Sequence, residues 1–231
     1  MSDNYNIAII LAAGNASRFN SEIPKQFVEV KGKTILEYSL EAFEKNKNID
    51  GITIVTNFQF VEQTEKLIAK NKYKKVKSVL IGGKERFDSS FVAIRAYSNK
   101  KNCNLIFHDA ARPLVSQRII DDVIKELDFY NAVDTAIPLT DTIIKINEKN
   151  YITEIPKREL FMRSQTPQAF NIETIKYAYE LALNDKTFFA TDDCGIVKKY
   201  LPNEKIVVIN GEERNFKVTF PEDIILMENF L

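Results

Sequence analysis

The chain has 231 residues, of which 45% are hydrophobic, enough to bury the core of one α/β domain or of two small ones. Lys plus Arg and Asp plus Glu each number 32, so the net charge is near zero and gives no long-range attraction to nucleic acid or anionic membranes. One histidine, His108, and two distant cysteines argue against a His/Cys zinc site and against a Ser-His-Asp triad.

The predicted elements alternate between strands and helices along the chain. The run "NIAIILAA" at 6–13 is continuously apolar, as expected of a parallel strand covered on both faces. Further strands are predicted at 51–56, 76–81, 104–109, 132–139 and 205–211. Helices are predicted at 34–46, 59–71, 89–98, 116–130, 172–183, 192–200 and 221–231. This order predicts one α/β domain over 1–231, with a mostly parallel sheet and helices on both faces.

Two local patterns add detail to this scheme. Thr34 followed by Glu37 predicts a capping box at the start of the first helix. The alternation breaks at 139–160, where two short β-like pieces surround the turn-prone sequence "NEKN". We therefore interpret 139–160 as a β-arm that leaves the main sheet.

Three loops should meet at one edge of the sheet, because ligands of open α/β sheets bind beyond the carboxyl ends of the strands. The first loop reads "LAAGNASRFNSEIPKQF", and its small residues would let backbone N–H groups approach phosphate oxygens, while Arg18 and Lys25 balance the charge. It matches neither the dinucleotide fingerprint nor the P-loop, and an ordinary turn with solvated cations is the alternative.

The other two loops are "IGGKERFDSS" and "HDAARP". Gly82 and Gly83 either form a simple turn or let a base lie flat against the backbone, with Ser89 bonding its edge. Asp109 either caps a turn or holds Mg²⁺ beside a triphosphate. His108 is expected to pack at the strand end rather than act as a general base.

Seven blocks in this order resemble the cytidylyltransferases that make CDP-methylerythritol or CDP-ribitol: "LAAGNASRFNSEIPKQF", "GGKERFDSS", "HDAARP", "DTIIK", "IPKRELFMRSQTPQAF", "TDDC" and "NFKVTFPEDI". The resemblance runs from residue 7 to about 226. It implies a Rossmann-like nucleotidyltransferase domain whose β-arm helps to form a homodimer. It also implies that a polyol phosphate attacks the α-phosphorus of CTP, so that positioning and cations carry the catalysis.

The resemblance implies roles for individual residues, with Mg²⁺ or another divalent cation as the cofactor. The catalytic cations would be Arg18, Lys25 and Lys217. CTP would be bound by Leu11, Ala12, Ala13, Gly14, Asn15, Gly82, Gly83, Arg86, Ser89, Asp109 and Ala110, with Asp109 also the metal ligand. The polyol phosphate would be bound by Arg112, Thr142, Arg158, Thr166 and Thr191, with Thr142 and Arg158 reaching the partner subunit's site. A helix cap is the alternative for Thr166 and Thr191.

The choice of substrate depends on the blocks around the arm. The sequences "IPKR", "NAVDTAIPLTDTI" and "TDDCGIVKKYLP" favour D-ribitol 5-phosphate or a related alditol phosphate, and methylerythritol phosphate is the alternative. A sugar-1-phosphate nucleotidylyltransferase would share the architecture, and testing UTP, GTP and dTTP beside CTP would separate it. A dinucleotide-dependent oxidoreductase would need the GxGxxG motif, which is absent here. A nucleotide-binding regulator that has lost catalysis would lack the three cations, which are all present.

The sequence also gives expectations about location. It has no run of roughly 18 apolar residues, so no membrane span is expected. The N-terminus lacks the pattern of a signal peptide, and two unpaired cysteines suit a reducing compartment, which favours the cytoplasm.

Overall fold

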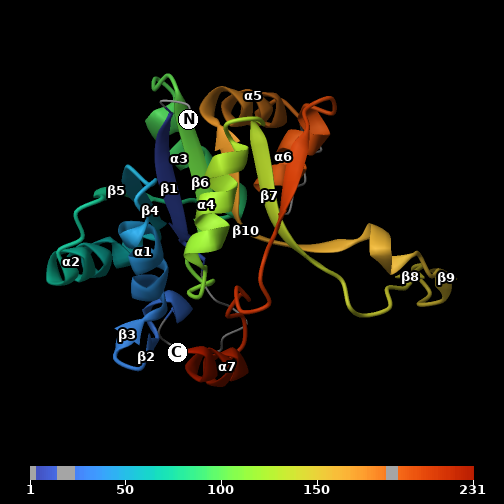
Figure 1. Ribbon diagram of the computed structural model, residues 1–231, viewed down its shortest axis with the longest axis horizontal. Helices are drawn as coiled ribbons and strands as arrows, with labels where there is room; N and C mark the ends of the chain where they lie inside the picture. Colours follow the sequence, from blue (N-terminus) through green and yellow to red (C-terminus); the bar gives the residue numbers. More distant parts are fainter. Residues whose placement is uncertain (1–3, 15–23, 186–191) are drawn as a thin grey trace.

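The computed structural model describes residues 4–14, 24–185 and 192–231 (Figure 1). Within these residues, seven strands form one sheet in the order β11-β7-β10-β6-β1-β4-β5. Its strands are β1 (Tyr5–Ala12), β4 (Gly51–Thr56), β5 (Val76–Ile81), β6 (Cys103–Asp109), β7 (Ala132–Pro138), β10 (Met162–Asn171) and β11 (Ile206–Asn210). All the neighbouring pairs are parallel except the two that involve β10. The mostly parallel α/β fold predicted from the sequence is confirmed.

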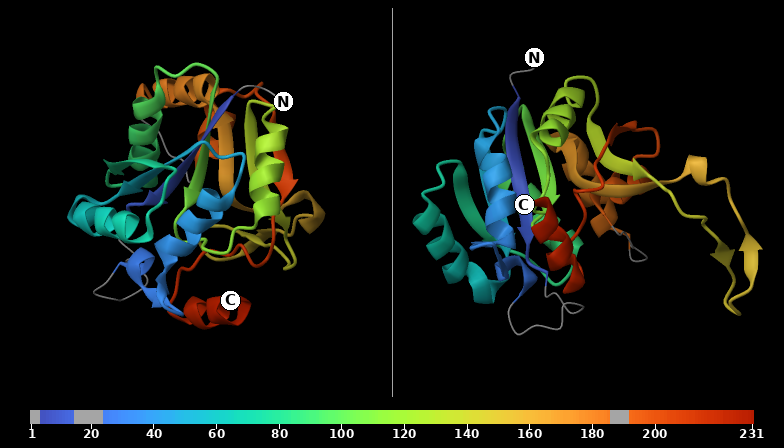
Figure 2. Two further views of the ribbon diagram at one scale, coloured as in Figure 1. Left: turned by 60° about the vertical axis from the view of Figure 1, so that its left-hand side comes forward. Right: turned by 60° about the horizontal axis from the view of Figure 1, so that its bottom comes forward.

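The helices lie on both faces of this sheet (Figures 1 and 2). They are α1 (Ile35–Lys45), α2 (Val61–Asn71), α3 (Arg86–Tyr97), α4 (Gln117–Glu126), α5 (Ile172–Leu183), α6 (Asp193–Tyr200) and α7 (Glu222–Phe230). Among the described residues, none of the helices is long and apolar enough to cross a membrane. The capping box is also confirmed, since Thr34 Oγ1 accepts from the Glu37 N–H and Glu37 Oε2 accepts from the Thr34 N–H.

Strand β1 shows how one apolar run serves two cores. Its residues alternate in direction, so Ala8 and Ile10 pack in the cluster that contains residues of α1, α2 and α4. Ile7 and Ile9 pack in the cluster that contains residues of α3, α5 and α6. Because β1 is buried on both faces, it needs no polar side, which explains the unbroken "IAII" of its sequence.

Strand β10 is the main element that the sequence analysis missed. It runs antiparallel between β6 and β7, and its register on β7 shifts between Gln165 and Ala169. The irregularity falls on the "QTPQAF" segment, where a proline cannot donate a ladder hydrogen bond. The segment is therefore a central strand with a bulge rather than only a turn.

The interruption at 139–160 is a β-arm, as predicted. Strands β8 (Lys145–Ile146) and β9 (Ile152–Glu154) pair antiparallel, and a 3₁₀ turn at Arg158–Leu160 leads back to β10. Figures 1 and 2 show the arm projecting well away from the sheet. Smaller elements elsewhere are the hairpin of β2 (Glu29–Val30) and β3 (Lys33–Thr34), and 3₁₀ turns at Lys25–Phe27 and Phe58–Phe60.

Helix α3 begins at Arg86, earlier than the expected residue 89. Glu85 caps it, because Glu85 and Asp88 each accept a hydrogen bond from the other's backbone N–H. The sequence pattern did not indicate this start, because the cap residue is Glu rather than one of the usual Ser, Thr, Asp or Asn. The earlier start places Arg86 in the first helical turn.

The core on the two faces of the sheet is close-packed, so we expect a cavity in it to lower the stability of the protein. Leu40 is fully buried on α1, so Leu40→Ala should lower the free energy of unfolding by about 2–5 kcal/mol. Leu183→Ala, at a position on α5 that is 52% exposed, is the matched control and should cost less than about 1 kcal/mol. Urea unfolding followed by circular dichroism measures both, and equal losses would contradict the packing described here.

Candidate active site at the carboxyl edge of the sheet

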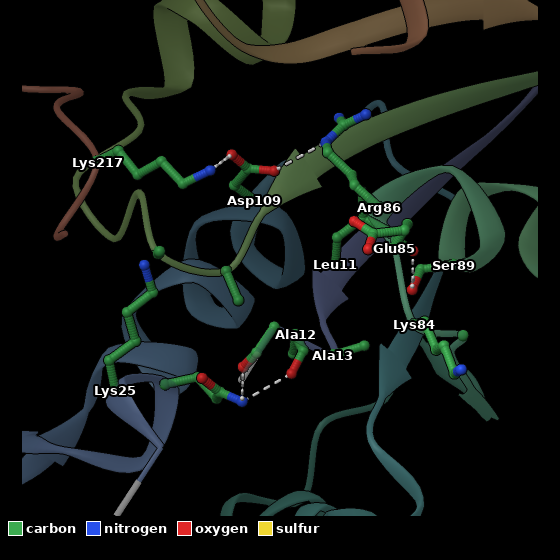
Figure 3. A pocket seen from close by; sticks show the side chains of 15 residues that line it. Leu11, Ala12, Ala13, Lys25, Lys84, Glu85, Arg86, Ser89, Asp109 and Lys217 are labelled. Carbon is green, nitrogen blue, oxygen red and sulfur yellow. Dashed lines mark hydrogen bonds and ion pairs between the residues drawn. The ribbon is translucent and has the colours of Figure 1, made fainter. Parts of the chain in front are cut away.

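A pocket opens where the loops after β1, β5 and β6 meet, as the sequence predicted (Figure 3). The loop before α7 contributes a further wall through Lys217. The pocket is lined by Leu11, Ala12, Ala13, Gly14, Lys25, Gln26, Gly83, Lys84, Glu85, Arg86, Ser89, Asp109, Ala110, Ala111 and Lys217. Most of the residues predicted to bind CTP therefore come together, along with two of the three predicted catalytic cations.

The carboxylate of Asp109 lies between two cations from distant parts of the chain. Lys217 Nζ donates to Oδ2 over 2.8 Å, and Arg86 Nε lies 3.5 Å from Oδ1 (Figure 3). Burial disfavours the charged form, but Lys217 and Arg86 outweigh it and hold the pKa of Asp109 far below its usual range. Asp109 is therefore ionised near neutral pH.

A buried glutamine, Gln26, holds the start of the loop after β1 in place. Gln26 Nε2 donates to the Ala12 carbonyl over 2.8 Å and lies 3.4 Å from the Gly14 carbonyl. These contacts engage the two carbonyl oxygens, whose partial negative charge would otherwise repel a phosphate. On the same side, Lys25 Nζ donates to the Val218 carbonyl over 2.8 Å, which ties this loop to the segment that carries Lys217.

The glycines after β5 are required by close packing. A Cβ on Gly82 would lie 2.6 Å from both Ala13 Cβ and Ser89 Oγ, and a Cβ on Gly83 would lie 2.1 Å from Asp88 Cβ. A side chain at Gly82 would push the start of α3 away from the loop after β1, and one at Gly83 would collide with the first turn of α3. The paired glycines therefore allow two walls of the pocket to approach each other, and Ser89, which is buried, lies between them.

His108 and Thr166 lie behind the pocket rather than in it. His108 is fully buried, with Nδ1 3.1 Å from Thr166 Oγ1 and Nε2 3.0 Å from the Arg112 carbonyl. Burial lowers the pKa of His108 to about 4, so the ring is neutral near pH 7, and its predicted packing role is confirmed. Thr166 Oγ1 also accepts from the Asp109 N–H over 3.0 Å. This residue of β10 therefore fixes the position of the end of β6.

Several predicted residues lie elsewhere. Arg112 does not line the described pocket, and its Nη1 donates to the Asn215 carbonyl over 2.8 Å. Thr142 and Arg158 lie exposed on the arm, and Arg158 Nη1 donates to the Thr140 carbonyl. The predictions for Asn15, Arg18 and Thr191 fall outside the described residues.

The structure adds residues that the sequence analysis did not single out. Gln26, Lys84, Glu85 and Ala111 line the pocket, and each is a neighbour of a residue that was predicted. Asp193, which follows the "TD" of a quoted block, lies 2.7 Å from Arg86 through Oδ2 and Nη1. Its burial is a property of the tertiary fold, so no local sequence pattern could have revealed it.

A larger depression, of about 770 Å³, borders α5 and the segment that follows α6. Its lining includes Glu173, Glu180 and Glu204 but only one lysine, Lys176. This charge balance repels a triphosphate, so the smaller pocket at the sheet edge is the better candidate for an anionic nucleotide.

A family model described as 2-C-methyl-D-erythritol 4-phosphate cytidylyltransferase matches residues 6–231. The chain is 43% identical over 230 residues to the bifunctional ribulose 5-phosphate reductase/CDP-ribitol pyrophosphorylase Bcs1 of Haemophilus influenzae, covering 99% of this chain and 48% of that protein. The chain thus spans about half the length of that relative. It is 39% identical over 229 residues to a 2-C-methyl-D-erythritol 4-phosphate cytidylyltransferase of Thermobifida fusca, covering 97% and 92%.

A solved structure shares the same architecture. It is that of the 4-diphosphocytidyl-2C-methyl-D-erythritol synthase of Anaerococcus prevotii, with a TM-score of 0.87 and 30% sequence identity. The match covers 98% of this chain and 96% of that one. The likeness therefore extends over nearly the whole length of both chains.

We expect His108 to make stability depend on pH. Its pKa falls from the ordinary 6.5 to about 4 on folding, so between these values the unfolded state binds more protons and stability falls as pH falls. Because of this single group, the free energy of unfolding should be about 2 kcal/mol lower at pH 5 than at pH 7. His108→Asn should reduce the loss between pH 7 and pH 5 by that amount in urea unfolding, and an unchanged loss would contradict the assignment.

Proposed function

The chain belongs to the 2-C-methyl-D-erythritol 4-phosphate cytidylyltransferase family, and we propose that it couples CTP to a polyol phosphate, D-ribitol 5-phosphate being the preferred substrate. The observation that carries the proposal is the pocket at the sheet edge, where Lys217 and Arg86 flank the ionised carboxylate of Asp109 and Lys25 lines the same pocket. Such a site suits a reaction between two phosphate-bearing anions, whose mutual repulsion must be overcome.

The chemistry is an in-line displacement. A phosphate oxygen of the polyol phosphate forms a bond to the α-phosphorus of CTP, the bond from that phosphorus to the bridging oxygen breaks, and pyrophosphate leaves. Lys25 and Lys217 stabilise the negative charge on the phosphoryl oxygens, and Arg18 joins them. The protein contributes positioning and charge stabilisation rather than a covalent intermediate.

The nucleoside end of CTP lies toward α3 in this proposal. Gly83 and Ser89, which both line the pocket, bind the cytosine. Gly82 lets α3 and the loop after β1 approach each other closely beside them. The residues from Leu11 to Gly14 lie along the nucleotide.

Mg²⁺ fits this pocket only as part of a nucleotide complex. The described residues contain no cluster of three or more His, Cys, Asp or Glu side chains that could hold a metal, and Asp109 is already paired with two cations. Asp109 would supply one oxygen, and phosphate oxygens and water would supply the others, as is usual for Mg²⁺. The ion would withdraw negative charge from the triphosphate.

General chemistry does not separate the two candidate polyol phosphates, because both carry a terminal phosphate and hydroxyl groups. Ribitol 5-phosphate is supported by the Haemophilus influenzae relative, whose name includes CDP-ribitol pyrophosphorylase. The second candidate, 2-C-methyl-D-erythritol 4-phosphate, is supported by the family description and by the Thermobifida fusca relative.

The arm supports a homodimer. Its apolar side chains are exposed although they lie on a slender hairpin that cannot bury them itself: Ile144, Ile146, Tyr151, Ile152, Ile155, Leu160, Phe161 and Met162. A second copy of the chain would cover them. Thr142 and Arg158 would then reach the partner's pocket, where the cation would bind the phosphate of the polyol.

Turnover with defined substrates tests the reaction. Pyrophosphate release should require CTP, and kcat/KM should be at least tenfold higher with ribitol 5-phosphate than with methylerythritol 4-phosphate. Lys25→Ala should lower kcat by about a hundredfold or more, as loss of a group that stabilises transition-state charge does. Lys45→Ala, an exposed lysine on α1, is the control and should behave like wild type. Full turnover by Lys25→Ala would contradict the mechanism.

Mixed dimers test whether each site is built from two chains. Lys25→Ala and Arg158→Ala should each be defective alone, but a dimer with one chain of each kind has one site in which both residues are native. Dimers isolated by two different affinity tags should therefore recover about half of the wild-type activity. Mixed dimers that form but stay at the level of the single variants would show that Arg158 does not act on the partner's pocket.

A further inference from the structure

Asp193 is a fully buried carboxylate at the start of α6, next to the pocket but not among the residues that line it. Its Oδ1 accepts a hydrogen bond from Tyr179 Oη, and its Oδ2 lies 2.7 Å from Arg86 Nη1. Its backbone N–H donates to Gln168 Oε1 over 3.2 Å. Groups from α3, α5 and β10 therefore all hold this one residue.

Arg86 contacts two carboxylates, and the contact with Asp193 is the closer one. The distance is 2.7 Å to Asp193 but 3.5 Å to Asp109, where it involves Nε. The Arg86 side chain is only 24% exposed, and a guanidinium so far removed from water needs a nearby negative charge. Burial opposes the charge on Arg86, but Asp193 first and Asp109 second raise its pKa above the ordinary value.

The position of Asp193 is itself rigid. The Tyr179 ring stacks on Phe87, with ring centroids 4.7 Å apart and planes 5° from parallel, and Phe91 lies 6.2 Å away on a parallel plane. Phe87 and Phe91 belong to α3, the helix that carries Arg86. The aromatic stack thus fixes the hydroxyl that holds Asp193, relative to the helix that presents the guanidinium.

We infer that Asp193 is a positioning residue for the proposed nucleotide site: it draws the Arg86 guanidinium away from Asp109. The inference rests on the proposed function, under which this pocket binds the nucleotide. With Arg86 held by Asp193, Asp109 Oδ1 keeps only a long contact to Nε and remains able to interact with a nucleotide complex. Arg86 itself lines the pocket, so a guanidinium held in this place adds positive charge beside an anionic nucleotide.

Removal of the charge at Asp193 has a specific consequence. In Asp193→Asn the side chain keeps its shape, but Asp109 becomes the nearest negative charge to Arg86. The guanidinium should then close onto Asp109 and compete for the same carboxylate oxygen. CTP affinity should fall for this reason even though neither Asp193 nor Tyr179 touches the pocket.

A double-mutant cycle tests the inference on CTP affinity, measured by isothermal titration calorimetry with Mg²⁺ present, and on kcat/KM for CTP. We expect Asp193→Asn and Arg86→Met each to weaken both quantities by about tenfold. Asp193→Asn added to Arg86→Met should change them by less than about twofold, because Asp193 acts through Arg86. Glu41→Gln, which removes the charge of a carboxylate that pairs with Lys33 and Lys45 away from the pocket, should leave both unchanged.

Two results would overturn the inference: an Asp193→Asn variant with native CTP affinity, or losses that multiply to about a hundredfold in the double variant. If Asp193 acted on stability alone, Asp193→Asn would lower the midpoint of unfolding. Its loss of CTP affinity would then be independent of the loss caused by Arg86→Met. If Asp193→Asn does not fold, Tyr179→Phe keeps the ring stack and removes only the hydroxyl, and it should weaken CTP affinity about twofold to fivefold. Wild-type protein that binds CTP but turns over no polyol phosphate would refute the proposed function instead.

Discussion

A buried carboxylate has to be paired, and in this chain the pairing of Asp109 brings the site together. Lys217 reaches it from a loop 108 residues further along the sequence, and Arg86 reaches it from the first turn of α3. Leaving such a charge unpaired would cost several kcal/mol, so folding itself fixes two cations at the carboxyl edge of the sheet. The site is therefore charged and preorganised before any ligand arrives.

The sheet order explains how this arrangement extends to the rest of the molecule. Strand β10 enters antiparallel between β6 and β7, so its irregular segment lies beside the end of β6 and supplies Thr166 to the Asp109 backbone. The same strand supplies Gln168, which accepts from the Asp193 N–H on α6. The arm connects β7 with β10, so its root lies at the same edge. One inserted strand thus links the pocket, the network behind it and the arm.

Much of this could be read from the sequence, for physical reasons that differ between elements. Strand β1 and the capping box at Thr34 are local patterns, since each depends on residues a few positions apart. The start of α3 and strand β10 were missed because a glutamate cap and a proline-containing central strand contradict the usual preferences. The pairing of Asp109 with Arg86 and Lys217, and the burial of Asp193, depend on the tertiary fold. The family resemblance, rather than any local rule, indicated Lys217.

The nucleotide is proposed to bind in the charged pocket around Asp109, and a crystal structure of the protein with CTP and Mg²⁺ would show this binding site. We expect the triphosphate between Lys25 and Lys217, the cytosine against Gly83 and Ser89, and Asp109 within reach of the metal. Well-ordered CTP in any other part of the molecule, with this pocket empty, would contradict this expectation.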